Sequence, residues 1–178
     1  MYFWSANNSK VTKLCEYADD AVCSVSWASS GKHIAIGNTS GEVDVFDAVK
    51  LQAIRTFEGH SGRVGSLAWN GYIIASGSRD RNILLRDVRE NKDYFCVLSG
   101  QKQEICGLKW SFDENTLASG GNDNKMFLWS LRKQKEMAKF NQHTAAVKAL
   151  AWSPHQHHIL ASGGGTADRC LRFFNTQT

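Results

Sequence analysis

The stretch V-G-S-L-A-W, from Val64 to Trp69, decides the fold because its pattern recurs along the chain. The other copies are V-C-S-V-S-W at residues 22–27, I-C-G-L-K-W at 105–110 and V-K-A-L-A-W at 147–152. Successive tryptophans in these copies stand 42, 41 and 42 residues apart. Such a regular period indicates that one supersecondary unit is repeated along the sequence.

Further short apolar runs, separated by polar turns, follow each copy. Runs of about 4 to 7 residues that are rich in Val, Ile, Leu and Phe and bounded by Gly, Asn, Asp or Ser are typical of β-strands. Four strands, a to d, in each period predict an all-β WD-repeat β-propeller, in which each repeat forms one blade. The runs are 34–37, 74–77, 117–120 and 160–163, then 42–47, 82–88, 125–130 and 170–175, with fourth runs such as 51–57 and 94–99.

The segment from Arg132 to Lys139 is compatible with a helical turn. Its charged residues also suit an exposed hairpin loop. We predict the loop, leading into a strand from Met137 to Phe140.

Polar residues recur at fixed places in the repeats. In WD repeats, a His before strand a, a Ser on strand b, an Asp in the b–c turn and a Trp on strand c form a buried hydrogen-bonded tetrad. No repeat here holds the whole set. The second has His60, Ser76 and Asp80 with Arg86 for the Trp; the third has Ser119, Asp123 and Trp129 with Gln101 for the His; the fourth has His143, Ser162 and Asp168 with Phe174 for the Trp; and the first has Ala18, Ile36, Ser40 and Phe46.

A carboxylate beside an imidazole also occurs in enzymes that use general acid–base catalysis. The His and Asp residues recur, however, at the same place in two repeats, whereas a catalytic pair is unique. We therefore interpret them as structural and predict that the chain is not an enzyme.

Charge and motif content argue against several ligand classes. The net charge is +4, and the arginines between Arg79 and Arg89 alternate with acidic residues, which does not favour nucleic acid. His155, His157 and His158 share a loop without a Cys or carboxylate at ligand spacing, so we predict a solvated loop and no metal site. The run Gly163 to Gly165 lacks the context of a phosphate-binding loop. We expect no cofactor and no small-molecule ligand.

The cysteine content and the hydropathy indicate the cellular compartment that we expect for the protein. Cys15, Cys23, Cys96, Cys106 and Cys170 are odd in number and lack C-x-x-C spacing, which favours reduced thiols in a nuclear or cytosolic protein. No apolar run approaches 18 residues and no secretory leader is found, so we expect no membrane association.

Several longer strings resemble the Fizzy and Fizzy-related proteins, the WD-repeat co-activators of the anaphase-promoting complex. The resemblance extends from Tyr2 to the last residues, and the turn G-G-G-T-A-D-R at 163–169 is unusual for a generic propeller. S-R-D-R-N-I-L-L-R-D and S-P-H-Q-H-H are closer to the Fizzy-related branch. The strings are YFWSANNSKVTKLC (2–15), VGSLAWN (64–70), SGSRDRNIL (76–84), LASGGNDNK (117–125) and AVKALAWSPHQHHILASGGGTADRCLRF (146–173).

The resemblance implies a substrate receptor in the nucleus and cytoplasm, without chemistry of its own. Its partners would be subunits of the anaphase-promoting complex, a ubiquitin ligase, and degron-bearing substrates such as mitotic cyclins. By position in the G-G-N-D-N turn, Asn122 and Asn124 would contact KEN-type degrons. Their amides offer both donors and acceptors, which suits such a peptide. Alternatively, residues 122–124 only favour a tight turn. We prefer this second interpretation for Asp123. D-box degrons would bind between the first and last blades of the ring.

The length departs from the family. Seven blades need close to 300 residues at this period, so the chain accounts for about four of an expected seven blades. The period divides residues 1–178 into strands c and d of one blade (1–15), whole blades at about 18–57, 60–99 and 101–140, and three strands of a last blade (143–178). Besides the co-activator, a truncated WD-repeat scaffold for protein–protein interaction, without ligase activation, therefore stays open as a second hypothesis.

Overall fold

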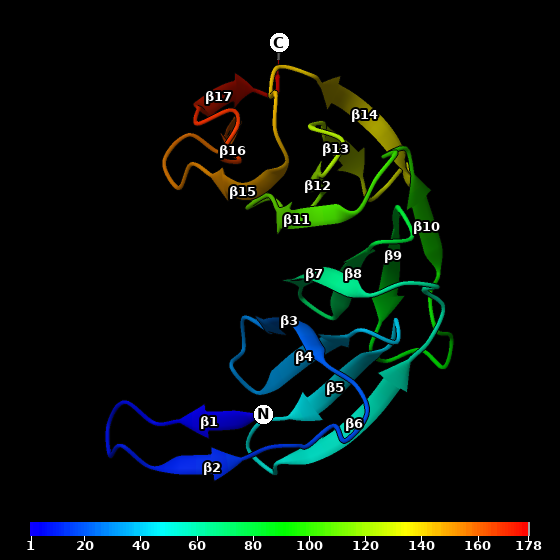
Figure 1. Ribbon diagram of the computed structural model, residues 1–178, viewed down its shortest axis with the longest axis vertical. Coiled ribbons are helices and arrows are strands. Elements are labelled where there is room, and N and C mark those ends of the chain that lie inside the picture. Colours follow the sequence, from blue (N-terminus) through cyan, green and yellow to red (C-terminus); the bar gives the residue numbers. More distant parts are fainter. Residues whose placement is uncertain (178) are drawn as a thin grey trace.

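The computed structural model describes residues 1–177, and all the regular elements within them are strands. The strands form five separate antiparallel sheets, arranged one after another along an arc (Figure 1). The prediction of an all-β propeller is confirmed. In chain order the sheets are β1 (Tyr2–Trp4) and β2 (Val11–Lys13); β3 (Val22–Trp27), β4 (His33–Asn38), β5 (Val43–Asp47) and β6 (Gln52–Phe57); β7 (Val64–Asn70), β8 (Ile73–Ser78), β9 (Asn82–Asp87) and β10 (Cys96–Ser99); β11 (Ile105–Trp110), β12 (Thr116–Gly121), β13 (Met126–Ser130) and β14 (Lys135–Phe140); and β15 (Val147–Trp152), β16 (Ile159–Gly164) and β17 (Leu171–Asn175).

The segment around Arg132 is a turn, and β14 begins at Lys135, two residues before the predicted start of that strand. Register explains the early start, because Lys135 pairs with Ser130 across a short hairpin. The fourth strand of the preceding sheet is shorter than predicted, since pairing begins at Cys96 rather than at Tyr94.

The core of the protein lies between neighbouring sheets. In the three four-stranded sheets the second and third strands are almost fully buried, whereas the outer strands β6 and β14 are largely exposed. The third strand of the last sheet, β17, is exposed at every second residue. A representative cluster joins Ile83, Leu85, Ile105, Leu117 and Phe127, which come from two adjacent sheets. Burial of these apolar faces, at about 25 cal/mol per Å², holds neighbouring blades together.

A glycine on the second strand of a sheet lets the next sheet approach. A Cβ added at Gly120 would lie 2.3 Å from the carbonyl oxygen of Val147, on the first strand of the following sheet. At Gly77 the added atom would lie 2.5 Å from Cγ2 of Ile105. The repeated glycine therefore permits the close contact between blades that the apolar cores require.

Tryptophan side chains also join the sheets. The indole Nε1 of Trp69 donates to the carbonyl oxygen of Ser26 at 2.9 Å, in the preceding sheet. Trp110 donates in the same way to Ala68 at 3.3 Å, and Trp152 donates to Lys109 at 3.2 Å. Three of the four tryptophans that mark the repeat thus link β7, β11 and β15 to the first strand of the preceding sheet.

Replacing Trp110 by phenylalanine keeps a large ring but removes the indole donor and its hydrogen bond to the Ala68 carbonyl. We expect the variant to lower the free energy of unfolding by about 1 kcal/mol or more. Chemical denaturation of the full-length protein measures the change. Tyr72→Phe is the control, because it removes a hydroxyl from a ring that is 57% exposed and is expected to change the stability little. Equal effects of the two substitutions would contradict the proposed role of the indole.

Candidate functional site

The first strand of each complete or three-stranded sheet carries a β-bulge at its second residue. Pairing shifts between Val22 and Ser24 in β3, and the same shift recurs in β7, β11 and β15. Such bulges re-aim a side chain and are frequent beside functional sites. The residues skipped by the pairing are Cys23, Gly65, Cys106 and Lys148.

These four bulge residues line one cavity of about 360 Å³, which we call the bulge cavity. Figure 1 shows the strands that carry them, β3, β7, β11 and β15, along the inner side of the arc. The cavity therefore lies where successive blades converge. Its remaining lining residues are Arg63, Glu104, Ile105 and Asn122.

The bulge cavity carries charges of both signs. Arg63 forms a bidentate ion pair with Glu104, with Nε to Oε1 at 2.7 Å and Nη2 to Oε2 at 2.8 Å. The hydrogen bonds from Arg63 lower the pKa of Glu104, and the charges of Arg79 and Lys148 act in the same direction. Glu104 is therefore ionised at neutral pH, and the cavity presents one carboxylate beside two cations.

The structure separates the two predicted ligand-binding asparagines. Asn122 is exposed and lines the bulge cavity, and its Oδ1 accepts a hydrogen bond from Sγ of Cys106 at 3.1 Å. Asn124 has a positive φ of 64° and donates from Nδ2 to the carbonyl oxygen of Thr144 at 3.1 Å. Asp123 accepts from the backbone N–H groups of Lys102 and Lys125 at 2.7 and 3.2 Å, and so secures the turn.

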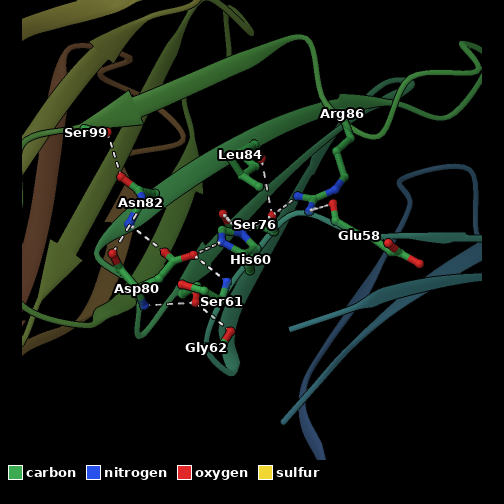
Figure 2. Close-up of polar contacts among 11 residues, drawn as sticks. Glu58, His60, Ser61, Gly62, Ser76, Asp80, Asn82, Leu84, Arg86 and Ser99 are labelled. Atoms are coloured by element: carbon green, nitrogen blue, oxygen red, sulfur yellow. Dashed lines mark hydrogen bonds and ion pairs between the residues drawn. The ribbon is translucent and has the colours of Figure 1, made fainter. Parts of the chain in front are cut away.

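In the second repeat, His60 joins Asp80 to Ser76 (Figure 2). Nδ1 lies 2.8 Å from Oδ2 of Asp80, and Nε2 lies 2.8 Å from Oγ of Ser76. Because the carboxylate requires a proton on Nδ1, the Ser76 hydroxyl donates to Nε2 of a neutral ring. Burial lowers the pKa of His60 against the opposing effect of Asp80, which agrees with the neutral form.

Arg86 extends this network from the position where tryptophan was expected. Figure 2 shows its guanidinium pointing toward Ser76 and Glu58. It donates to Oγ of Ser76 and, at 3.0 Å, to the carbonyl oxygen of Glu58. Arg86 is fully buried, and burial lowers its pKa to about 10, so the side chain still carries a charge at neutral pH.

The third and fourth repeats use different sets. Trp129 donates its indole N–H to Oγ of Ser119 at 2.8 Å, and the buried Gln101 donates to the Lys125 carbonyl oxygen at 3.5 Å instead of joining Asp123. In the fourth repeat, His143 contacts Asp168 at 2.5 Å and Ser162 at 2.6 Å. The tetrad residues are thus brought together only in part in the third repeat.

Arg172 is a member of the fourth network that the sequence pattern did not identify. It donates to Oδ2 of Asp168 at 2.6 Å, and this bond, followed by the contact with His143, holds the pKa of Asp168 far below its usual range. Phe174, at the tryptophan position, packs on Phe140 with ring centroids 4.6 Å apart. An arginine two residues before the expected position is the signal that could have identified it.

The first repeat contains an unpredicted network around Asp44. Asp44 is 7% exposed and accepts hydrogen bonds from Tyr17 at 2.6 Å, Asn38 at 3.2 Å and Thr56 at 2.6 Å. Burial, together with the bond to Asp44, raises the pKa of the Tyr17 hydroxyl. The sequence signal for this network is the carboxylate of Asp44 within the buried apolar strand 43–47. The expected tetrad positions of the first repeat did not identify it.

The histidine loop lies elsewhere, beside a separate cavity of about 530 Å³. His157 meets the ring of Phe112 edge-on, with centroids 5.3 Å apart. Within residues 1–177, no group of three or more His, Cys, Asp or Glu side chains is arranged to hold a metal ion. That part of the chain also contains no helix able to cross a membrane.

Radial antiparallel sheets with tetrad-like networks define a WD-repeat β-propeller protein. The chain belongs to the CDC20/Fizzy WD40 domain family, whose model matches residues 1–178. The resemblance to the Fizzy and Fizzy-related proteins is thereby confirmed.

Curated relatives support the Fizzy-related branch. The chain is 56% identical to the B-type cell cycle switch protein ccs52A of Medicago truncatula and 55% identical to Protein FIZZY-RELATED 2 of Arabidopsis thaliana. It is 46% identical to the anaphase-promoting complex subunit cdc20 of Dictyostelium discoideum. Each match covers 100% of this chain but only 38%, 37% and 37% of the relatives, respectively.

A solved structure matches the fold closely. A chain in the crystal structure of the mitotic checkpoint complex superimposes with a TM-score of 0.96 and is 40% identical. The match covers 99% of this chain and 54% of that chain.

The lowered pKa of His60 predicts a pH dependence of stability. The unfolded ring, with an ordinary pKa of about 6.5, takes up a proton before the folded ring does. The contribution of His60 is therefore complete above that pH and is lost as the pH falls toward the folded pKa. His60→Gln, which installs the residue found in the third repeat, is expected to reduce the fall in melting temperature between pH 7 and pH 5. Parallel melting curves for the two proteins over this range would contradict the prediction.

Proposed function

We propose that this chain is the degron-recognising part of a co-activator of the anaphase-promoting complex. Its family membership supports the assignment, as do the names of relatives: one is an anaphase-promoting complex subunit and others are cell cycle switch proteins. The solved neighbour comes from the mitotic checkpoint complex. Its partners would be subunits of that ligase and substrates such as mitotic cyclins, in the nucleus and cytoplasm.

The observation that carries the proposal is the Asn122 amide beside charges of both signs in the bulge cavity. A KEN-type degron presents a lysine, a glutamate and an asparagine. Glu104 offers a carboxylate to the lysine, while Arg63 and Lys148 offer cations to the glutamate. The Asn122 amide suits the asparagine, because it both donates and accepts.

Binding without catalysis is consistent with the chemistry of the networks. His60 and His143 each lie between a carboxylate and a serine, as in a catalytic triad, but the rings are 8% and 5% exposed. A substrate cannot reach a buried serine hydroxyl without opening the blade. The repeated networks therefore support a scaffold that presents loops to a peptide.

Replacing both Asn122 and Asn124 by alanine is expected to weaken binding of a KEN peptide by about 1 to 3 kcal/mol, because polar groups of the peptide lose their partners. We expect Asn122→Ala alone to account for most of the loss, since the Asn124 amide is engaged by Thr144. Isothermal titration of the full-length protein measures the affinity.

Asn91→Ala, at an exposed turn outside the bulge cavity, is the protein control, and a peptide with Lys-Glu-Asn replaced by alanines is the ligand control. Unchanged affinity in the double variant would show that the asparagines serve only the turn.

A further inference from the structure

Cys106 occupies a specific place in the bulge cavity. It is the residue skipped by the pairing between β11 and β12, so its side chain leaves the alternation of the strand. It is partly buried and lines the cavity beside Glu104 and Asn122. Cys106 Sγ lies 3.1 Å from Oδ1 of Asn122 and 3.5 Å from the carbonyl oxygen of Glu104.

The contact between Cys106 and Asn122 has a direction. Both neighbours of the sulfur are oxygen acceptors, so the thiol is the donor in either contact. Burial raises the pKa of the Cys106 thiol, which keeps the proton on sulfur at neutral pH. The Asn122 amide oxygen is therefore the atom that faces the cysteine.

An amide held by its oxygen presents its nitrogen elsewhere. Asn122 Nδ2 has no hydrogen-bond partner among the bonds formed within residues 1–177, and the side chain is exposed at the cavity. Rotating the amide by half a turn would bring its NH₂ group toward the sulfur and end the hydrogen bond from the thiol to the amide oxygen. The thiol thus favours the orientation in which two N–H donors are free.

We propose that Cys106 is a positioning residue of the ligand site, which fixes the Asn122 amide with its N–H donors available to an acceptor on the bound peptide. This inference rests on the proposed function, because it assigns a role to Cys106 in the same site. The ligand group that contacts Asn122 is then a carbonyl or carboxylate oxygen.

A parallel contact occurs in another repeat. Cys23, the bulge residue of β3, lies 3.4 Å from Oγ1 of Thr39, which stands at the corresponding place in its b–c turn. Gly65, the bulge residue of β7, has no side chain to reach its turn. The bulge thus places a side chain against the b–c turn, and in the third repeat that turn residue is Asn122.

The test compares two substitutions of Cys106. Cys106→Val removes the donor at similar volume, whereas Cys106→Ser retains a donor. In titrations of the full-length protein with a KEN peptide, we expect the valine variant to raise Kd by about threefold to tenfold, the range that one neutral hydrogen bond commands. The serine variant is expected to stay within about twofold of the unmodified protein. Cys170→Val, an exposed cysteine outside the cavity, is the control.

A double-mutant cycle separates positioning from packing. In an Asn122→Ala background, Cys106→Val is expected to cause no further loss of affinity, because there is no amide left to orient. An equal loss in both backgrounds, or equal losses for the valine and serine variants, would overturn the inference. Melting curves of each variant show whether a loss of affinity comes from unfolding. If the valine variant unfolds, the affinity of the serine variant tests the positioning role of Cys106.

The outcomes also distinguish the two proposals. If Asn122→Ala weakens binding while Cys106→Val does not, the positioning role is overturned and the proposed function stands. If Asn122→Ala leaves the affinity unchanged, the proposed function of this turn fails, and the inference about Cys106 fails with it.

Discussion

The indole hydrogen bond between consecutive first strands is the contact on which the arrangement depends. A backbone carbonyl in the preceding blade accepts from Trp69, Trp110 and Trp152 in turn, at 2.9, 3.3 and 3.2 Å. Apolar burial attracts blades to one another but is non-directional, so it does not fix how far each turns. A side-chain donor directed at one carbonyl supplies that direction. This dual requirement, a large ring and a polar edge, explains the tryptophans of β7, β11 and β15, whereas Trp27 stacks on the ring of Phe3 with centroids 5.3 Å apart.

The same geometry determines where a ligand site can form. The first strands β7, β11 and β15 are each bonded near the end by the tryptophan and bulged near the beginning, so the two ends of the strand have different roles. Bulged residues are free of the pairing, and their side chains converge on one cavity because the blades converge there. Residues of different chemistry, such as Cys106 and Lys148, can therefore occupy the bulge position without changing the strand pairing. The scaffold is fixed at one end of the strand, and variation is tolerated at the other.

The sequence predicted the fold well because the period and the strand runs are local patterns that tertiary packing did not alter. It located His60, Asp80, His143 and Asp168 by their position in the repeat, and the structure brings each pair together. It missed Arg172 and the network around Asp44, because these depend on which side chain reaches across the register. It also missed the cavity itself. A bulge is a shift in pairing between two strands, which has no signature in the hydrophobic pattern of either one.

The altered tetrads show what the networks must accomplish. In the second repeat a buried arginine bonds the serine in place of an indole, and in the fourth an arginine bonds the aspartate while Phe174 packs with its neighbour. In the first, Asp44 gathers three donors by itself. Different groups thus pair most of the buried polar atoms between strands b and c. Within residues 1–177, the buried side-chain atoms left without a partner are Asn38 Oδ1, Arg86 Nε and Gln101 Oε1. In the third repeat Asp123 holds the turn through the backbone N–H groups of Lys102 and Lys125, so the ligand contact that we propose for Asn122 does not compete with that role.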